Sequence, residues 1–302
     1  MTQVVVLGSL NMDLVTTVDR LPQIGETIFA KRLDYFIGGK GANQAVAASR
    51  VGGNVTMLGK VGKDTFGERI IRHLQQETLE VAAIAAEDQQ STGIANVFKL
   101  PKDNCIMVVP GANACVDEAY VKQNAATIET ATLLLMQLET PIEAVKKALS
   151  IAKAAGVTTI LNPAPFSEEA KELLTEVEYI TPNELEFQGL LPNDLKALSF
   201  EAAMLEFSTR FQTRLIVTRG SKGVSFVEKG KVVTIPTRKA KVVDTTGAGD
   251  TFNGILATQL SKGETLETAI EFATIGATLS TTKFGAQTGM PTLNELEKFK
   301  NL

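Results

Sequence analysis

The chain alternates short apolar runs with longer amphipathic stretches, and this order restricts its fold more than any other feature of the sequence. The apolar runs predict buried strands at 4–7, 55–58, 132–136, 158–161, 179–180 and 215–217. Apolar residues at helical spacing predict helices at about 42–51, 64–78, 117–128, 141–155, 168–176, 183–190 and 200–210. Strands and helices that alternate in this way form an α/β fold, with a mostly parallel sheet between two layers of helices.

Other parts of the chain are predicted to form a hairpin, three further helices and two segments that break the alternation. The hairpin is expected at 224–227 and 232–235, and the helices at 248–262, 264–282 and 292–301. The two exceptional segments, 14–37 and 93–110, alternate apolar and polar residues, as strands with one exposed face do. We expect them to form a small β layer beside the site, inserted into a single domain that spans 1–302. Two surface hairpins without a role are the alternative.

Composition disfavours several classes of function. The formal net charge of −4 gives no attraction to nucleic acid or to an anionic membrane surface. No stretch approaches the ~20 apolar residues of a membrane span, and the N-terminus lacks a basic region, so we expect a cytoplasmic location. Two cysteines, Cys105 and Cys115, are expected to be reduced thiols. The single histidine, His73, is expected on a surface helix, which disfavours a Ser-His-Asp hydrolase.

Polar side chains follow five of the predicted strands directly. Open α/β sheets bind ligands beyond the carboxyl ends of their strands, so these positions are candidates for a site. They carry amide, carboxylate or hydroxyl groups, or are glycines between them: Gly8, Ser9, Asn11, Asp13, Gln137, Glu139, Asn162, Thr181, Asn183, Glu184, Glu186, Thr218, Gly220, Ser221 and Gly223. Their convergence suits a small, hydroxyl-rich ligand such as a sugar, although each residue alone is more often a helix cap.

The most informative local motif is Asp244–Asp250, which directly precedes a helical pattern. Gly247 and Gly249 have no Cβ, so an anion can approach the free backbone N–H groups at the positive end of the helix. Such a loop can stabilise the charge on a transferring phosphoryl group. Asp250, in the first helical turn, can accept a proton from a hydroxyl placed beside it. A glycine turn followed by an acidic residue with no such role is the alternative.

Two competing nucleotide-binding motifs are absent from the sequence. The chain has no GxxxxGK[ST] segment, so it is not a P-loop enzyme. The glycines of Gly38–Gly41 and of Gly247–Gly249 do not form GxGxxG, which weakens an interpretation as a dinucleotide-dependent oxidoreductase. Gly38–Gly41 nevertheless opens the 42–51 helix, where Asn43 can offer an amide to a ligand.

These motifs resemble those of the ribokinase-like family of sugar and nucleoside kinases. The resemblance covers the whole chain and rests on two family signatures in the expected order, Gly38–Gly53 and Asp244–Asp250. Finer matches are Gly8–Asp13, Gly39–Ala45, Gly111–Asn113, Met136–Glu139, Asn162–Pro165 and Thr181–Glu184. The resemblance implies a central sheet sandwiched by helices, a small β-sheet lid, and ATP-dependent phosphorylation of D-ribose at O5.

The resemblance also implies a role for each matching residue. The sugar would be bound by Asn11, Met12, Asp13, Gly39, Lys40, Gly41, Ala42, Asn43, Glu139 and Asp250. Asp250 would be the general base on the 5-hydroxyl, and the backbone of Gly247, Ala248 and Gly249 would form an anion hole. ATP would be bound by Asn183, Thr218, Arg219, Gly220, Ser221, Lys222, Gly223, Gly249, Asp250 and Thr274.

Two cations and a second copy of the chain are implied in the same way. K⁺ would be held, mostly through backbone carbonyls, by Asp244, Thr246, Ser280, Lys283, Gly285 and Gly289. Oxygen ligands of this kind suit a hard cation. Mg²⁺ would be linked indirectly to Glu186, and the lid would form a homodimer interface. The sequence departs from the family pattern at Thr274, where relatives carry Asn or His near the adenine, and at Gly289, where a hydroxyl residue is common.

Three alternatives to a ribose kinase are considered from the sequence. A kinase of another small sugar or nucleoside would share every motif above. A non-catalytic sugar-binding sensor would not need Asp250 or the glycines beside it. An oxidoreductase is the third alternative, and it lacks its usual glycine motif.

Overall fold

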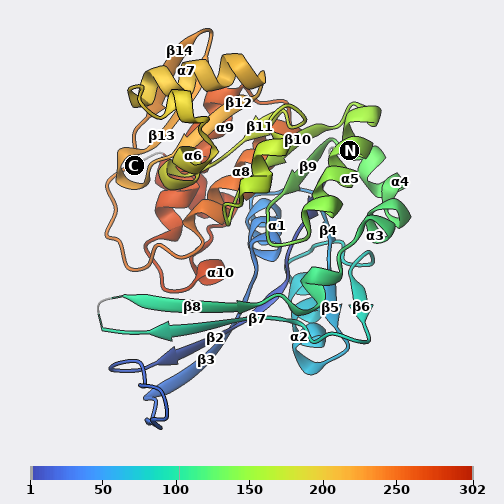
Figure 1. Ribbon diagram of the computed structural model, residues 1–302, viewed down its shortest axis with the longest axis vertical. Coiled ribbons are helices and arrows are strands. Elements are labelled where there is room, and N and C mark those ends of the chain that lie inside the picture. Colours follow the sequence, from blue (N-terminus) through green and yellow to red (C-terminus); the bar gives the residue numbers. More distant parts are fainter. Residues whose placement is uncertain (1–2, 102, 301–302) are drawn as a thin grey trace.

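The computed structural model describes residues 3–101 and 103–300, and its main body is built around an eight-stranded sheet (Figure 1). The strand order is β14-β13-β12-β11-β10-β9-β1-β4, with parallel pairing from β12 to β4 and antiparallel pairing at β13 and β14. The bounds are β1 Val4–Leu7, β4 Val55–Leu58, β9 Leu133–Met136, β10 Thr158–Leu161, β11 Tyr179–Ile180, β12 Arg214–Thr218, β13 Val224–Glu228 and β14 Lys231–Ile235. The predicted mostly parallel sheet is confirmed.

Helices cover both faces of this sheet because its strands are apolar on both sides. In β1, Val4 and Val6 belong to one buried cluster, while Val5 and Leu7 belong to the other. The first cluster is completed by α1 Lys40–Arg50, α2 Thr65–Gln76, α8 Ala248–Ser261, α9 Leu266–Ser280 and α11 Leu293–Lys300. The second is completed by α3 Glu118–Gln123, α4 Ala125–Glu129, α5 Ile142–Ala155, α6 Glu184–Leu190 and α7 Phe200–Phe211. Side chains that alternate between two cores explain the continuous apolar runs in the sequence.

Four local details differ from the sequence-based prediction. The helix expected at 117–128 is divided into α3 and α4 at Asn124, whose side-chain amide donates to the Tyr120 carbonyl oxygen. The segment expected as a helix at 168–176 is a 3₁₀ helix at Glu168–Leu173. A small parallel pair, β5 Lys60–Gly62 and β6 Ala85–Glu87, was not predicted, and neither was the four-residue α10 Ala286–Gly289. These elements are short, so they have no periodicity that could identify them.

A four-stranded sheet, hereafter the lid, extends from the main body below α10 (Figure 1). Its order is β3-β2-β7-β8, with bounds β2 Asn11–Thr17, β3 Arg32–Gly38, β7 Gly93–Lys99 and β8 Asn104–Val109. The lid therefore begins at Asn11, three residues before the predicted start at 14, and residues 18–31 contain no strand. The alternation at 27–31 was misleading, because Phe29 there is fully exposed and a strand needs a paired neighbour.

Two helices of the main body approach each other unusually closely. A Cβ on Gly254 of α8 would stand 2.3 Å from the carbonyl oxygen of Gln44 in α1 and 2.8 Å from the Cβ of Ala47. The glycine thus allows backbone contact between the two helices. Both helices begin at the edge of the sheet that faces the lid, so their N-terminal residues meet there. Within the described residues, every helix is too short or too polar to traverse a lipid bilayer.

Candidate active site

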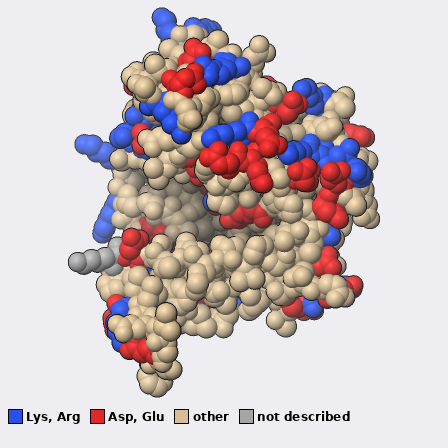
Figure 2. Space-filling view, viewed as in Figure 1, with Lys and Arg blue, Asp and Glu red and all other residues tan. Residues whose placement is uncertain are grey.

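A cleft of about 450 Å³ separates the lid from the N-termini of α1 and α8. Figure 2 shows this hollow, with acidic side chains at its edge and a largely uncharged lid surface beneath it. From the lid, alternate residues face the cleft, as the pleat of the strands requires. They are Asn11, Asp13 and Val15 of β2, Ala95, Val97 and Lys99 of β7, and Asn104, Ile106 and Val108 of β8, while β3 contributes the neighbouring residues Phe36 and Ile37. From the main body come Gly39, Lys40, Asn43, Glu139, Asp244, Thr246, Gly247 and Asp250.

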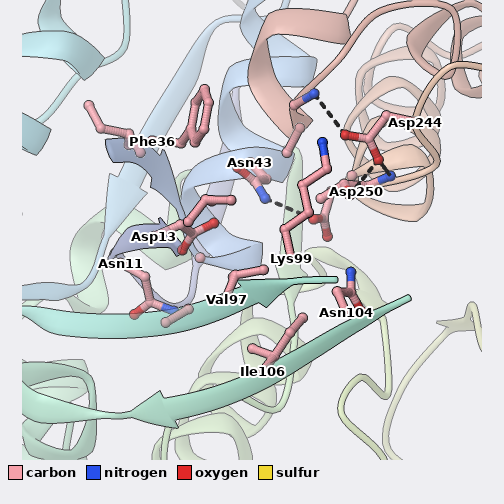
Figure 3. A pocket seen from close by; sticks show the side chains of 18 of the residues that line it. Asn11, Asp13, Phe36, Asn43, Val97, Lys99, Asn104, Ile106, Asp244 and Asp250 are labelled. Atoms are coloured by element: carbon pink, nitrogen blue, oxygen red, sulfur yellow. Dashed lines mark hydrogen bonds between the residues drawn. The ribbon is translucent and has the colours of Figure 1, made fainter. Parts of the chain in front are cut away.

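Asp250 lies at the inner end of this cleft, in the first turn of α8 (Figure 3). Its carboxylate accepts one hydrogen bond on each oxygen, from Asn43 Nδ2 to Oδ2 and from Gln44 Nε2 to Oδ1, both at 3.0 Å. The side chain is buried, and burial is the main reason that its pKa is raised; nearby Glu139 adds to this effect. The Lys40 ammonium and the two amide donors act in the opposite direction. A buried carboxylate with raised proton affinity has the properties of a general base.

Lys40 and Glu139 stand beside Asp250 and have opposite charges. Glu139 is held by the Ser9 hydroxyl, which donates to its Oε2 at 2.5 Å, and by the backbone N–H of Lys40 at 3.0 Å. Burial disfavours the charged form of Lys40, but the negative charges of Asp250, Glu139 and Glu186 outweigh it and raise the Lys40 pKa. Lys40 therefore remains an ammonium, which can attract a negatively charged group in the cleft.

Asn11 and Asp13 form the lid side of the cleft (Figure 3). The carbonyl oxygen of the Asn11 amide accepts from Asn113 Nδ2 at 2.7 Å, which fixes the orientation of Asn11. Burial raises the pKa of Asp13 to about 7, and the charges of Glu139 and Asp250 add to this effect. Together these groups offer the donor and acceptor pairs that a polyhydroxylated ligand needs.

The start of α8 exposes its backbone to the cleft. Gly247 has φ of +75°, the left-handed conformation that glycine tolerates, and a Cβ there would collide with Ala286 at 2.8 Å. By contrast, a Cβ on Gly249 would meet no atom within 4 Å, so the space above it is free for a ligand. The N–H groups of this first turn have no partner within the helix, and the helix dipole favours an anion there.

A second pocket, of about 490 Å³, lies on the other side of this helix start. Its lining includes six residues predicted to bind nucleotide: Thr218, Gly220, Ser221, Gly223, Gly249 and Thr274. The Thr274 hydroxyl donates to the Ile270 carbonyl of its own helix at 2.7 Å, so it can only accept a hydrogen bond from a ligand. Gly247 and Asp250 border the first pocket, whereas Ala248 and Gly249 border the second. One helix start is therefore shared by two pockets, which is the arrangement that group transfer between two bound molecules needs.

Several predicted nucleotide-binding side chains lie outside the second pocket. Arg219 donates to Glu184 Oε1 at 3.0 Å and to Ser225 Oγ at 3.1 Å, and it stacks over the Phe200 ring. Lys222 also binds Glu184, at 3.2 Å. Asn183 forms a reciprocal capping box with Glu186 at the start of α6. The side chains of Arg219, Lys222 and Asn183 therefore all make contacts within the protein.

Three predicted sugar-binding residues, Met12, Gly41 and Ala42, do not line the cleft. Met12 and Ala42 are fully buried in the core cluster that contains α1. Gly41 packs against the backbone of the Gly8–Ser9 segment, where a Cβ would stand 2.6 Å from Ser9 N. These residues therefore support the segments that carry the lining residues Asn11, Asp13, Lys40 and Asn43.

The predicted K⁺ residues come from two loops that are joined by hydrogen bonds. Asp244 accepts from the N–H and hydroxyl of Thr246 on Oδ1 and from the Gly285 N–H on Oδ2. Burial opposes the charged form of Asp244, but these donors and the Lys99 ammonium lower its pKa overall. Gly289 packs against the Ser280 carbonyl oxygen, which would stand 2.3 Å from a Cβ there. Lys283 points to Glu295 at 3.0 Å, so only its backbone is available to the two loops.

Two glutamines at the site were not among the predicted residues. Gln44 donates to Asp250 and to Asn162 Oδ1, and its own carbonyl oxygen accepts from Gln137 Nε2 at 2.7 Å. Gln287 of α10 donates to Asn43 Oδ1 at 3.0 Å. Gln44 lies in the Gly39–Ala45 motif, yet the direction of its side chain becomes evident only when α1 and α8 are packed together. No sequence signal identifies Gln287, since its partner is distant in the chain.

Comparisons with known proteins agree on one family. The sequence matches the pfkB family of carbohydrate kinases over residues 1–293. A ribokinase from Lactococcus lactis is 41% identical over 304 residues, covering 100% of this chain and 98% of its own. The crystal structure of ribokinase from Thermotoga maritima aligns with a TM-score of 0.91 at 33% identity, covering 100% of this chain and 99% of that one. Arabidopsis thaliana ribokinase complexed with ribose and ATP aligns with a TM-score of 0.91 at 29% identity, with coverage of 100% and 99%.

Proposed function

Because this chain belongs to the pfkB family of carbohydrate kinases, we propose that it transfers the γ-phosphoryl group of ATP to the 5-hydroxyl of D-ribose. The observation that carries the proposal is the position of Asp250, which is buried at the junction of two pockets that share one helix start. A relative named ribokinase, 41% identical along the whole chain, supports ribose as the substrate. So does the similarity to a plant ribokinase that was solved with ribose and ATP.

In the proposed reaction, the sugar occupies the lid cleft and the nucleotide occupies the second pocket. Asp250 accepts the proton of the 5-hydroxyl as that oxygen attacks the γ-phosphorus, and ADP leaves in line with the new bond. The backbone N–H groups of Gly247–Gly249 stabilise the negative charge that develops on the phosphoryl oxygens. Lys40, which remains charged, can interact with the same group from the α1 side. Asn11, Asp13, Asn43 and Glu139 would bind and orient the sugar hydroxyls.

Mg²⁺ would be a partner of the nucleotide phosphates rather than of the protein, because the described residues that line the second pocket include no carboxylate. Within the described residues, no group of three or more His, Cys, Asp or Glu side chains is placed to hold a metal ion. Mg²⁺ needs no such group, because it is commonly held by substrate phosphates, water and one or two carboxylates. Glu186 is the candidate carboxylate, and its pKa is raised by burial although the Asn183 N–H and Lys40 oppose this. Bound Mg²⁺ would neutralise charge on the phosphates.

K⁺ fits the two joined loops near the anion hole. The Ser280 carbonyl and the backbone of Lys283, Gly285 and Gly289 are candidate ligands, because a hard monovalent cation takes carbonyl oxygens. Both carboxylate oxygens of Asp244 already accept hydrogen bonds from these loops, so Asp244 would act mainly by holding them in place. A bound cation there would add positive charge close to the start of α8.

The lid also supports a proposed homodimer. β8 is an edge strand, and Ile106, Met107, Val108 and Val109 along it are each about half exposed. An exposed apolar edge of this kind favours pairing with another sheet. The double variant Met107→Asp/Val109→Asp, at positions of β8 that do not line the cleft, should sediment as a monomer in analytical ultracentrifugation if the wild type is a dimer through the lid. A wild type that sediments as a monomer would refute this part of the proposal.

As a kinase that uses ATP, the protein would act in the cytoplasm.

The central test is ADP release on addition of ribose, compared among other pentoses, 2-deoxyribose and nucleosides, and repeated with Na⁺ in place of K⁺. Asp250→Asn should lower kcat by ~10²–10⁴-fold, because the base is removed, while the dissociation constant of ribose changes little. Binding of ribose by calorimetry and a thermal melt serve as controls that the variant is folded. Near-normal turnover by folded Asp250→Asn would remove the proposed base.

A further inference from the structure

The only histidine of the chain is joined to Asp250 by a continuous line of side-chain hydrogen bonds. His73 Nε2, on α2, lies 2.8 Å from Gln287 Oε1 of α10. Gln287 Nε2 donates to Asn43 Oδ1 at 3.0 Å, and Asn43 Nδ2 donates to Asp250 Oδ2 at 3.0 Å. Gln287 and Asn43 are more than nine-tenths buried, whereas the His73 side chain is 28% exposed. The line thus runs from the surface of the protein to the proposed base.

The direction of every bond in this line is fixed by its inner end. An ionised carboxylate can only accept, so Asn43 must turn its NH₂ group toward Asp250 and its oxygen toward Gln287. Gln287 must then turn its NH₂ group toward Asn43, which leaves its oxygen facing His73. That oxygen is satisfied only if His73 carries a proton on Nε2. Both the Nε2–H neutral tautomer and the imidazolium meet this condition.

Gln287 is also held by its backbone, which fixes the position from which its side chain extends. Arg50 of α1 donates to the carbonyl oxygens of Gln287 and Met290, the latter at 3.0 Å. Arg50 is itself paired with Glu77 at 2.6 Å, and Glu77 lies 3.9 Å from His73 Nε2. The last turn of α2 and the residue directly after it therefore supply the imidazole and the carboxylate that hold α10 against α1.

We propose that Gln287 and His73 are positioning residues that lock the Asn43 carboxamide in the donating orientation toward Asp250. The proposal rests on the proposed function, in which Asp250 is the base. An unlocked Asn43 can turn over when Asp250 is protonated and accept a hydrogen bond from it, which stabilises the protonated acid. The lock removes this option, so the ionised form of Asp250 is favoured before the sugar is deprotonated.

A second arm holds the other oxygen of Asp250 in the same way. Gln137 Nε2 donates to Gln44 Oε1 at 2.7 Å, and Gln44 Nε2 donates to Asp250 Oδ1 at 3.0 Å. Each oxygen of the carboxylate therefore faces a carboxamide whose own oxygen is already taken by another carboxamide. The charged and titratable groups around Asp250 are Lys40 of α1, Glu139 after β9, Asp13 of β2 and Glu186 of α6. None of these belongs to the His73 arm, so variants of that arm leave their charges unchanged.

The first test is the tautomer of His73. Protein labelled with ¹⁵N-histidine gives one imidazole spin system, because the chain has one histidine. Long-range ¹H–¹⁵N spectra of the neutral imidazole at alkaline pH should show Nε2 protonated and Nδ1 bare. A neutral imidazole protonated at Nδ1 would contradict the proposed direction of the bonds and overturn the proposal.

The second test is the pH profile of kcat/KM for ribose in four variants. Gln287→Met keeps the shape of the side chain but removes both of its hydrogen bonds. The acid limb of the kcat/KM profile should therefore shift to higher pH by ~0.5–1 unit, which is within the free energy of one hydrogen bond to a charged group. His73→Leu should also shift the acid limb to higher pH, by a smaller amount. His73→Gln, which can present an N–H near the Nε2 position, should restore the wild-type limb. Arg72→Gln, at an exposed position of the same helix, is the matched control and should leave the profile unchanged.

The outcomes separate the proposal from a structural role and from the proposed function. If all His73 and Gln287 variants melt at lower temperature but keep the wild-type acid limb, the two residues only support the fold and the proposal is wrong. If His73→Gln shifts the acid limb as His73→Leu does, the N–H donor at position 73 is not the cause of the lock. If Asp250→Asn is inactive while Gln287→Met keeps the acid limb, the base stands and only the lock fails. Normal turnover of Asp250→Asn would refute both.

Discussion

Gly254→Ala tests whether the close contact between α1 and α8 assembles the site. The added Cβ would stand 2.3 Å from the Gln44 carbonyl oxygen, and this neighbour is backbone that has no rotamer to escape into. Non-bonded heavy atoms pack at about 3.5 Å, so the helices must separate by ~1 Å. Gln44 is also the residue whose amide reaches Asp250 at 3.0 Å. A separation of that size would stretch this bond beyond the range of a hydrogen bond.

Two effects of this substitution can be estimated. Overpacking of a well-packed core costs about 1–3 kcal/mol, and the better helix propensity of Ala offsets up to ~1 kcal/mol of it. The net loss should lower Tm by ~1–4 °C in a domain of this size. Displacement of the groups around the base by ~1 Å can lower kcat by on the order of 10²-fold.

Gly249→Ala is the matched substitution, about one and a half helical turns closer to the pockets. A Cβ at Gly249 would meet no protein atom within 4 Å, so the fold should tolerate it and Tm should not fall. The methyl group would instead occupy the space that we assign to the transferring phosphoryl group. We therefore expect kcat/KM for ATP to fall by on the order of 10–10³-fold, comparable with the loss of one oxyanion-hole donor.

Thermal melts and ribose-dependent ADP release on both variants would check this reasoning. The expected pattern is a loss of stability and activity in Gly254→Ala, and a loss of activity alone in Gly249→Ala. A Gly254→Ala variant with the wild-type Tm and kcat would refute the idea that backbone contact between α1 and α8 sets the geometry. A fully active Gly249→Ala variant would refute the proposed anion hole.

Two further predictions concern carboxylates of the site. Asp13 has a folded-state pKa of about 7, above its value of 3.8 in the unfolded chain, so its contribution to stability is present below pH 4 and is lost as pH rises toward 7. Asp13→Asn, which mimics the neutral acid, should therefore raise Tm at pH 8 and lose that gain toward pH 4; a gain that is the same at both pH values would contradict the assignment. Glu186→Gln should raise the Mg²⁺ concentration needed for half-maximal velocity by ~3–30-fold, as for an outer partner of a metal site, and an unchanged Mg²⁺ titration would exclude that role.

Elements that depend on local pattern could be predicted from the sequence. β1 and β9 are apolar on both faces, and the glycines of Asp244–Asp250 precede a helical period, so both the sheet and the start of α8 were expected. Asn11 was expected in a loop after β1, and it instead opens β2, because its strand pairing with Gly38 and Gly93 is formed by distant segments. Its polar side chain faces the cleft and carries no apolar signal.

The direction of side-chain hydrogen bonds could not be predicted, for the same reason. His73 has an ordinary helical context, and its partner Gln287 lies 214 residues further along the chain. Gln287 in turn binds Asn43, which is 244 residues away from it. Local sequence specifies that α2 and α1 are helices, but it does not specify which of their polar side chains face α10. Such contacts follow from the packing of whole elements.

The choice of amides as partners for Asp250 follows from what a base must do. A direct ion pair would stabilise the carboxylate strongly and lower its affinity for the proton it has to accept. Carboxamides from Asn43 and Gln44 orient both oxygens without adding a full charge, so burial still raises the pKa of Asp250. The full positive charge is instead carried by Lys40, whose pKa is raised by the surrounding carboxylates and which therefore stays protonated when Asp250 takes its proton. Proton transfer and charge stabilisation are thus assigned to different residues, whose charges act on each other: the Lys40 ammonium opposes the raised pKa of Asp250, and the Asp250 carboxylate helps to raise the pKa of Lys40.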